Sequence, residues 1–234
     1  MSQGAAQGRR PQNANDVSYM AGGFGLLYDA SGDDRYTGSV FAQGVGYWQG
    51  LGMLIDGAGN DQYDALWYIQ GSSAHFSLSF FWDAGGDDRY DLGFSPAATS
   101  IGVGHDFSAS IHLDEGGSDQ YHGPGLSLGS GNINGIGCLL NLGGDDLFTA
   151  DGDPTLGAGN YSAEAPYGED RQSAPTIGIF VHTGGKGTYT VGGQDRPLAN
   201  STWSYEPQPY PSPQTVTTEH GCGADRPGGS VSLP

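Results

Sequence analysis

The sequence predicts an all-β protein, a single-stranded parallel β-helix (a β-solenoid) of about six coils with about 27 residues each. Three observations predict this fold. An eight-residue motif recurs six times, the spacing between its copies is nearly constant, and the segments between copies are short apolar or alternating runs separated by glycine turns. Such runs are typical of strands and not of helices. We expect the β-helix to be right-handed.

The motif is an acidic, glycine-centred octet whose clearest copy, DGAGNDQY, begins at Asp56. Its fourth residue is Gly and its eighth is aromatic in every copy. Because glycine is expected where the backbone turns through positive φ, each octet predicts a tight turn. The other copies begin at Asp29, Asp83, Asp114, Asn141 and His182, and successive starts are separated by 27, 27, 31, 27 and 41 residues.

The same register extends through the residues between octets. A short apolar stretch, such as 26–28 or 80–82, precedes each octet, and a small residue stands four positions before it. Propeller blades need about 40 residues, whereas a coil of three short strands needs fewer. Coils stacked ~4.8 Å apart would place the six repeats in a core roughly 29 Å long.

The repeats divide the chain into three parts. Residues 1–19 are polar and predict an N-terminal tail or cap, and residues 20–196 predict the β-helix domain, with a protruding loop at about 149–176. Residues 197–234 are rich in Pro, Ser, Thr and Gly and predict a C-terminal tail. Ordered tails would be held either by the end of the β-helix or by a neighbouring molecule.

The charge balance excludes several classes of partner. With 26 acidic and 8 basic residues, the chain has a net charge of −18, so it repels nucleic acids and anionic lipids and attracts cations. A salt-adapted acidic surface is the alternative interpretation. No segment approaches the ~18 apolar residues that a membrane span requires. The N-terminus lacks the apolar core of a signal peptide, which fits either an intracellular protein or a mature or trimmed form.

Equivalent residues of successive coils stack on one another in a β-helix. The fifth octet position alternates between charged and neutral residues, which avoids like charges at neighbouring levels. Two other columns do not alternate: the first-position column is Asp29, Asp56, Asp83 and Asp114, and the sixth-position column is Asp34, Asp61, Asp88, Asp119 and Asp146. Two unit charges ~4.8 Å apart repel by roughly 1 kcal/mol in water and ~3.5 kcal/mol at an effective dielectric constant of about 20. We expect these carboxylates to splay into solvent, to accept backbone N–H groups or to share cations.

The octet resembles part of the calcium-binding β-roll repeat of RTX proteins, GGxGxDxUx. Residues 57–63, GAGNDQY, match its GxGxDxU portion, with an aromatic residue at U. The resemblance implies Ca²⁺ bound between turns by the sixth-position column, and the first-position column is an added candidate because Ca²⁺ takes six to eight oxygen ligands. The repeat departs from the RTX pattern in having one turn per 27 residues and an Asp in place of the first Gly. Alternatively, these aspartates only cap the N–H groups of their own turns.

A second candidate site is a pair of residues, His75 and Asp106, that each stand eight positions before an octet. They should therefore stack on adjacent coils, where they could act as a general base and its orienting group. Trp48, Phe76 and Phe107 lie in neighbouring columns and would add an aromatic surface of the kind that binds sugars. The alternative is a solvent-facing ladder with an incidental ion pair.

These observations favour a non-catalytic structural and binding module. We expect a Ca²⁺-stabilised, extracellular or cell-surface β-solenoid that presents a face and its tails to a protein partner or to a second copy. One alternative is a polysaccharide lyase or hydrolase that uses His75 and Asp106, which rests on analogy with other β-helices. Another is a subunit whose tails lock it into a larger assembly.

Overall fold

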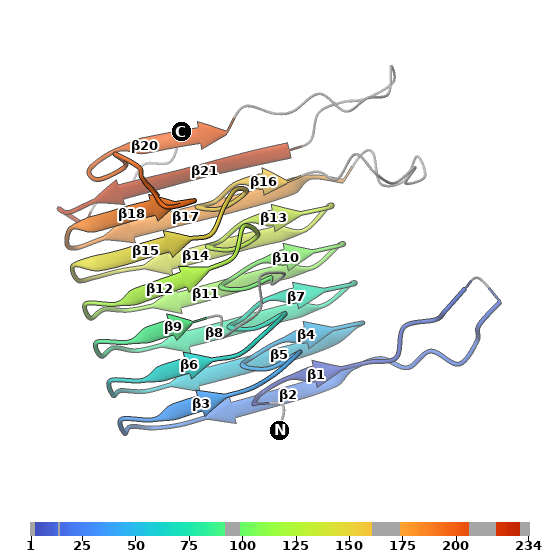
Figure 1. The fold of residues 1–234 in the computed structure, drawn as a ribbon. Helices are drawn as coiled ribbons and strands as arrows, with labels where there is room; N and C mark the ends of the chain where they lie inside the picture. The colour runs from blue at the N-terminus through green and yellow to red at the C-terminus, as the bar shows by residue number, and fades with distance from the viewer. Residues whose placement is uncertain (1–2, 14, 92–98, 161–173, 206–218, 230–234) are drawn as a thin grey trace, which may run out of the picture.

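The computed structural model describes residues 3–13, 15–91, 99–160, 174–205 and 219–229. These residues form strands, bridges and turns without a helix, so the prediction of an all-β fold is confirmed for the described part of the chain. Consistently, none of this part offers a helix with the length and apolarity to cross a bilayer. The strands form three sheets that run along the whole stack (Figure 1).

Sheet 1 has six short strands, all parallel. In spatial order they are β1 (Ala6–Gln7), β4 (Gly46–Tyr47), β7 (Ser73–Ala74), β10 (Gly104–His105), β13 (Gly131–Asn132) and β16 (Gly159–Asn160).

Sheet 2 contains the longest strands and is parallel except at its last pair. Its order is β2 (Gly23–Tyr28), β5 (Gly50–Asp56), β8 (Leu78–Asp83), β11 (Ala109–Asp114), β14 (Ile136–Asn141), β17 (Thr176–Thr183), β21 (Glu219–Arg226) and β20 (Thr202–Tyr205).

Sheet 3 follows the octet turns and is also parallel except at its last pair. Its order is β3 (Arg35–Thr37), β6 (Gln62–Asp64), β9 (Arg89–Asp91), β12 (Gln120–Gly123), β15 (Asp146–Ala150), β18 (Gly187–Val191) and β19 (Gln194–Asp195).

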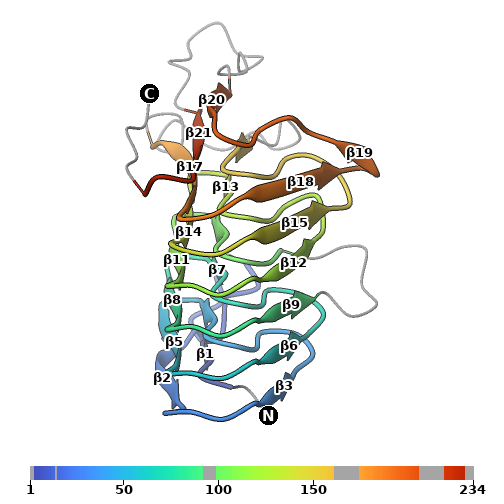
Figure 2. The ribbon, with the colours of Figure 1, turned by 90° about the vertical axis from the view of Figure 1, so that its left-hand side faces the viewer.

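From β1 to β18, paired strands are equivalents from successive repeats, three strands apart along the chain, which is the arrangement of a β-solenoid (Figures 1 and 2). The register follows the repeat, because Tyr36 pairs with Tyr63 and Tyr63 with Tyr90. The predicted stacking of equivalent residues is therefore confirmed. Adjacent parallel strands supply the backbone hydrogen bonds that a single coil cannot make alone.

The recurring small residues stand where backbones approach one another. Gly52 points inward from β5, and a Cβ there would lie 2.2 Å from the carbonyl oxygen of Val45 beside sheet 1. At the fourth octet position, Gly59 has a φ of 153°, and a Cβ would lie 1.5 Å from the carbonyl oxygen of Gly32. Glycine is therefore needed both for the conformation of the octet and for its contact with the next turn.

The core is a column of aromatic rings contributed by the eighth octet position. Neighbouring rings are nearly parallel, with centroids 4.6–5.2 Å apart, so the stacking continues across coils. Leu54, Phe81, Leu139 and Phe180 pack against this column from sheet 2. The column itself is Tyr36, Tyr63, Tyr90, Tyr121, Phe148 and Tyr189.

Both terminal regions contribute strands to the solenoid. Strand β1, within the expected N-terminal tail, pairs with β4, and β20 and β21, within the expected C-terminal tail, extend sheet 2. Trp203 of β20 packs on Phe180 and Tyr189, with ring centroids 5.7 and 6.2 Å apart. The centre of the loop expected at 149–176, residues 161–173, and residues 206–218 of the C-terminal region lie outside the described part.

Candidate metal centre

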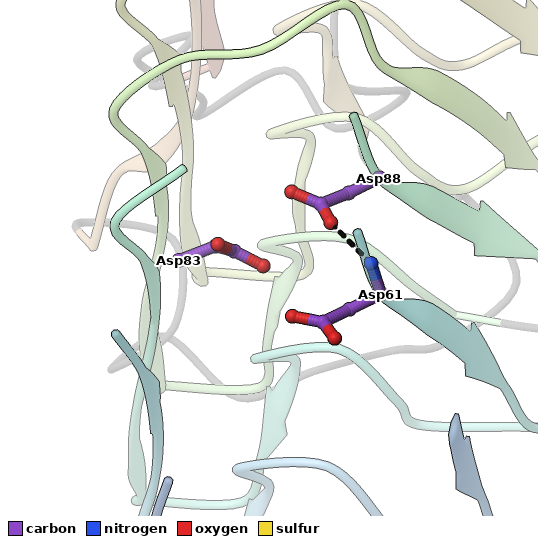
Figure 3. A group of neighbouring side chains, drawn as sticks. All are labelled: Asp61, Asp83 and Asp88. Carbon is purple, nitrogen blue, oxygen red and sulfur yellow. Dashed lines mark hydrogen bonds between the residues drawn. The ribbon is translucent and has the colours of Figure 1, made fainter. Parts of the chain in front are cut away.

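The two aspartate columns face each other inside the solenoid. Asp83 and Asp114 end strands of sheet 2, whereas Asp61, Asp88 and Asp119 directly precede strands of sheet 3, so each octet turn carries one of each kind across the corner between the sheets. All five residues are at most 3% exposed. Figure 3 shows Asp83 pointing from one side toward Asp61 and Asp88 on the other. Aspartates at this depth need compensating partners.

Two groups of three carboxylates result from this arrangement. In the first, which we call the lower cluster, carboxylate oxygens of Asp61, Asp83 and Asp88 lie within 4.8 Å of one another. In the upper cluster the same holds for Asp88, Asp114 and Asp119. Asp88 belongs to both clusters. The sequence predicted that each column would stack on itself, but it did not predict that the two columns would meet.

The sixth-position carboxylates use one oxygen to bind the neighbouring coil. Asp88 Oδ1 accepts the backbone N–H of Asp61 at 2.6 Å, and Asp119 Oδ1 accepts that of Asp88 at 2.8 Å. Asp146 continues the series at 2.7 Å from the backbone nitrogen of Asp119. The aspartates therefore do cap backbone N–H groups, but the sixth-position side chains cap an adjacent coil instead of their own turn.

The first-position carboxylates are held by their own turn and by tyrosine. Asp83 Oδ1 accepts the N–H of Gly85 at 3.1 Å, which is the local cap expected for an Asx-turn. Its Oδ2 accepts the hydroxyl hydrogen of Tyr63 at 2.8 Å, and Asp114 Oδ2 accepts that of Tyr90 at the same distance. The tyrosines of the core column therefore also orient the acids of the site.

The second carboxylate oxygen of the sixth-position aspartates has different surroundings along the column. Among the described residues, Asp61 Oδ2 and Asp88 Oδ2 are buried and make no hydrogen bond. Burial, reinforced by neighbouring carboxylates, raises the pKa of Asp61 to about 7, of Asp83 to about 6 and of Asp88 to about 8. The same causes raise the pKa of Asp119 to about 10. The clusters therefore require protons or cations to neutralise them.

At the next levels of the stack, the protein supplies its own donor. Asn141 replaces Asp in the first-position column, and its Nδ2 donates to Asp119 Oδ2 at 3.4 Å and to the hydroxyl of Tyr121 at 3.0 Å. One coil further, His182 occupies this position, with Nε2 2.8 Å from Asp146 Oδ2 and Nδ1 2.9 Å from Asp225 Oδ2.

His182 is enclosed between two acidic side chains. Burial alone would lower its pKa, but contact with Asp146 and Asp225 outweighs this effect and raises the pKa. The imidazole is fully enclosed together with both carboxylates. At the levels where the first-position residue is Asp, a further carboxylate stands at the place that Asn141 or His182 occupies in the later coils. The two clusters therefore mark the levels at which neutralisation must come from outside the chain or from bound protons.

The donor set of the clusters fits a hard divalent cation. Carboxylates and hydroxyls are ligands that Ca²⁺ prefers, whereas Zn²⁺ prefers nitrogen and sulfur. Because Ca²⁺–oxygen distances are about 2.4 Å, oxygens that all lie within 4.8 Å of one another are close enough to share one ion. The unpaired Oδ2 atoms of Asp61 and Asp88 are the ones that such an ion would satisfy.

The other predicted ligands lie outside these two clusters. Asp29 and Asp34 belong to the first octet and are less buried. Asp56 is buried and accepts the hydroxyl hydrogen of Tyr36 at 2.5 Å. Asp146 contacts His182. None of these four joins a group of three ligand residues in the described part of the chain.

His75 and Asp106 stack on adjacent coils, with His75 Nδ1 2.5 Å from Asp106 Oδ2. Both residues lie at the corner between sheets 1 and 2, where φ is positive at His75 (62°) and Asp106 (53°). The second ring nitrogen of His75, Nε2, lies 3.2 Å from a guanidinium nitrogen of Arg10. This third residue was missed by the sequence analysis, because it is 65 positions away in the chain and outside the repeats.

The ring of His75 is thus held at both nitrogens, and His75 is buried. A general base needs a nitrogen that can reach a substrate proton, and Arg10 stands at the nitrogen that is not used for Asp106. The geometry therefore favours a structural role for the pair. No protein-family model, curated protein or solved structure matches the chain.

Proposed function

We propose that this chain is a non-catalytic structural and binding module, a right-handed parallel β-helix of about six coils that is stabilised by internal Ca²⁺. The observation that carries the proposal is the pair of buried, unpaired carboxylate oxygens of Asp61 and Asp88, each aimed into a group of three acids. Bound Ca²⁺ would join the coils in the same way as His182 joins Asp146 and Asp225.

Two further points support this proposal. The octet resembles the RTX turn, and its sixth-position Asp supplies two of the three acids in each cluster. In addition, extracellular modules bind Ca²⁺ with dissociation constants of about 10⁻⁴–10⁻³ M. A scaffold whose interior is completed by Ca²⁺ would be most stable where this ion is abundant, and we therefore propose an extracellular or cell-surface location.

A Ca²⁺ titration followed by calorimetry and thermal unfolding tests the proposal. We expect saturable binding of about two ions per chain and a rise in Tm that EDTA reverses, because a ligand that binds only the native state stabilises it by mass action. Mg²⁺ should be less effective, since it requires shorter distances and keeps its water shell. An unchanged Tm between EDTA and millimolar Ca²⁺ would remove the cation from the proposal.

A sugar-binding role is the second candidate, and one observation favours it. Phe76 and Phe107 form a stacked pair, with ring centroids 5.3 Å apart, and Phe76 is half exposed. Trp48 contacts Phe76 edge-on at 6.0 Å. Such aromatic platforms suit sugar rings. A glycan-binding screen with Phe76→Ala tests this role, and turnover of a polysaccharide that disappears in His75→Ala would instead establish the lyase or hydrolase.

A further inference from the structure

The outward side of sheet 2 is an apolar face. Strands β2, β5, β8, β11, β14 and β17 each point three residues outward, in register with one another. All of these residues are uncharged, and we call them together the apolar face. They are Phe24, Leu26, Tyr28, Leu51, Met53, Ile55, Leu78, Phe80, Trp82, Ala109, Ile111, Leu113, Ile136, Cys138, Leu140, Ile177, Ile179 and Val181.

Sheet 3 of the same solenoid shows what a solvent-facing sheet looks like in this protein. Its outward positions carry Arg35, Asp64, Arg89 and Asp91, which form the ion pairs Arg35–Asp64 and Arg89–Asp91. Strands with one wet side alternate apolar and polar residues, whereas strands covered on both sides are nearly continuously apolar. The outward positions of sheet 2 lack the charged residues of such a wet side, although Leu78 and Ile111 are 53% and 42% exposed.

The size of the apolar face is at the upper end of what a monomer normally leaves uncovered. Six strands ~4.8 Å apart, with three outward residues per strand, cover roughly 29 by 20 Å, or about 600 Å². The largest apolar patch of a typical monomer is about 300–600 Å² and is often functional. Two such faces in contact would bury roughly 1,200 Å² in total, which reaches the lower limit of a stable protein–protein interface.

We propose that the apolar face binds the same face of a second copy of this chain, to form a two-fold symmetric dimer by sheet-on-sheet packing. The face is made of regular rows with the spacing of the β-ladder, so a second copy presents rows of the same period, as in the two layers of a β-sandwich. A protein of net charge −18 can approach its own copy most favourably through a surface without charges. The same net charge disfavours an anionic membrane as the occupant.

The acidic groups of the octet turns are consistent with this geometry. Asp33, Asp87 and Asp145 are exposed at the corner between sheets 2 and 3, where they would form the rim and not the centre of the interface. A polar rim around an apolar centre is the usual anatomy of such contacts. The dimer rests on the binding role proposed above and names a second copy of the chain as the partner. It uses a different part of the molecule from the two acidic clusters.

Sedimentation velocity and light scattering on the full chain in millimolar Ca²⁺ test the dimer. We expect twice the chain mass for the wild type, and at least about 100-fold weaker association for Leu78→Lys and Ile111→Lys, because each places a charge within the buried face. Leu147→Lys is the matched control: Leu147 is 40% exposed, similar to Ile111, but lies on sheet 3, so this variant should remain dimeric.

Circular dichroism and the Ca²⁺ response of each variant establish that it is folded, so that loss of the dimer and loss of the cation sites are distinguished. The proposal is overturned if the folded wild type is a monomer at about 100 μM. It is equally overturned if Leu147→Lys dissociates the dimer as strongly as Ile111→Lys, or if Leu78→Lys and Ile111→Lys leave the dimer intact. Binding of the wild-type monomer to neutral lipid vesicles would assign the face to a membrane instead.

Discussion

Asp88 binds the backbone of Asp61 through Oδ1, at 2.6 Å, and leaves its Oδ2 buried without a donor among the described residues. One oxygen therefore joins two coils, while the other increases the negative charge of the interior. The same side chain belongs to both acidic clusters. Substitution of Asp88 therefore separates two effects on stability: the destabilisation by its buried charge and the stabilisation by a cation that it helps to bind.

Asp88→Asn should have opposite effects in the two conditions. Asparagine keeps the oxygen that accepts the N–H of Asp61 but removes the charge, so at pH 9 in EDTA the variant should be more stable than wild type by about 1–3 kcal/mol. In Ca²⁺ it should be the less stable protein, since both clusters lose a ligand. Chemical denaturation in each buffer measures this. Asp87→Asn is the control, because Asp87 is the exposed neighbour in the same turn, and a similar response in this variant would contradict the assignment.

The apoprotein should lose stability as the pH rises from about 4 to 8. The pKa values of Asp61 and Asp88 are raised to about 7 and 8, so the native state retains protons that the unfolded chain, with Asp pKa values near 3.9, has released. For each such proton, the free energy of unfolding falls by about 1.4 kcal/mol for every unit by which the pH rises within this window. Tm measured against pH in EDTA checks the sign.

Saturating Ca²⁺ should abolish or reverse this pH dependence, because metal ligands must be deprotonated to bind. Binding should also release protons, which calorimetry in buffers of different ionisation enthalpy detects. A Tm that rises from pH 4 to 8 without Ca²⁺ would show that the clusters are neutralised in another way.

His182→Gln should destabilise the protein by about 3–5 kcal/mol, because it leaves the buried Asp146 and Asp225 without their cation. Because the pKa of His182 is raised in the folded state, the direction in which its contribution to stability changes with pH is defined. Its stabilisation is complete below the unfolded-state pKa of about 6.5 and is lost as the pH rises through the higher folded-state pKa. Urea unfolding at pH 6 and pH 9 should show a larger difference between wild type and variant at pH 6.

His122→Gln is the matched control for this prediction. His122 also lies between two carboxylates, Asp91 at 3.2 Å and Asp151 at 3.1 Å, but its side chain is 43% exposed. Solvent screening should limit the loss to about 1 kcal/mol or less. Equal effects of the two substitutions would mean that burial does not determine the strength of the His182 contact.

Gly59→Ala should prevent folding or remove several kcal/mol of stability, because the new methyl group would lie 1.5 Å from the carbonyl oxygen of Gly32, at a φ of 153°. Soluble yield and thermal unfolding are the measurements. Gly152→Ala is the control, since no atom lies within 4 Å of a Cβ at that position. A stable Gly59→Ala variant would contradict the close contact between successive octets.

The repeat predicted the stacked strands well, because the spacing of the octets directly determines which residues lie one above another. It did not predict which side of the ribbon the aspartates occupy. Asp56 and Asp61 are separated by a turn, in which no strand or helix period indicates direction. General experience places Asp at the surface, whereas both residues are buried here.

Two further features could not be predicted from pattern alone. The contact of Arg10 with His75 joins a non-repetitive segment to the array, so no column contains it. The apolar runs of sheet 2 were evident in the sequence, but a run such as 80–82 does not show which of its residues point outward until the register of the strand is known. The alternation in β5, in which Leu51, Met53 and Ile55 face outward, resolves this question.

The hydrogen bonds that the N–H groups of Asp34, Asp61, Asp88 and Asp119 donate to the carboxylate of the following coil have a consequence for how such a chain can change. A substitution within one turn alters the support of its neighbour, whereas the insertion or deletion of an entire repeat leaves every donor facing an acceptor of the same kind. Lengthening by duplication of whole coils is thus the mildest alteration available to this architecture, and frameshifts of a single residue are among the most damaging.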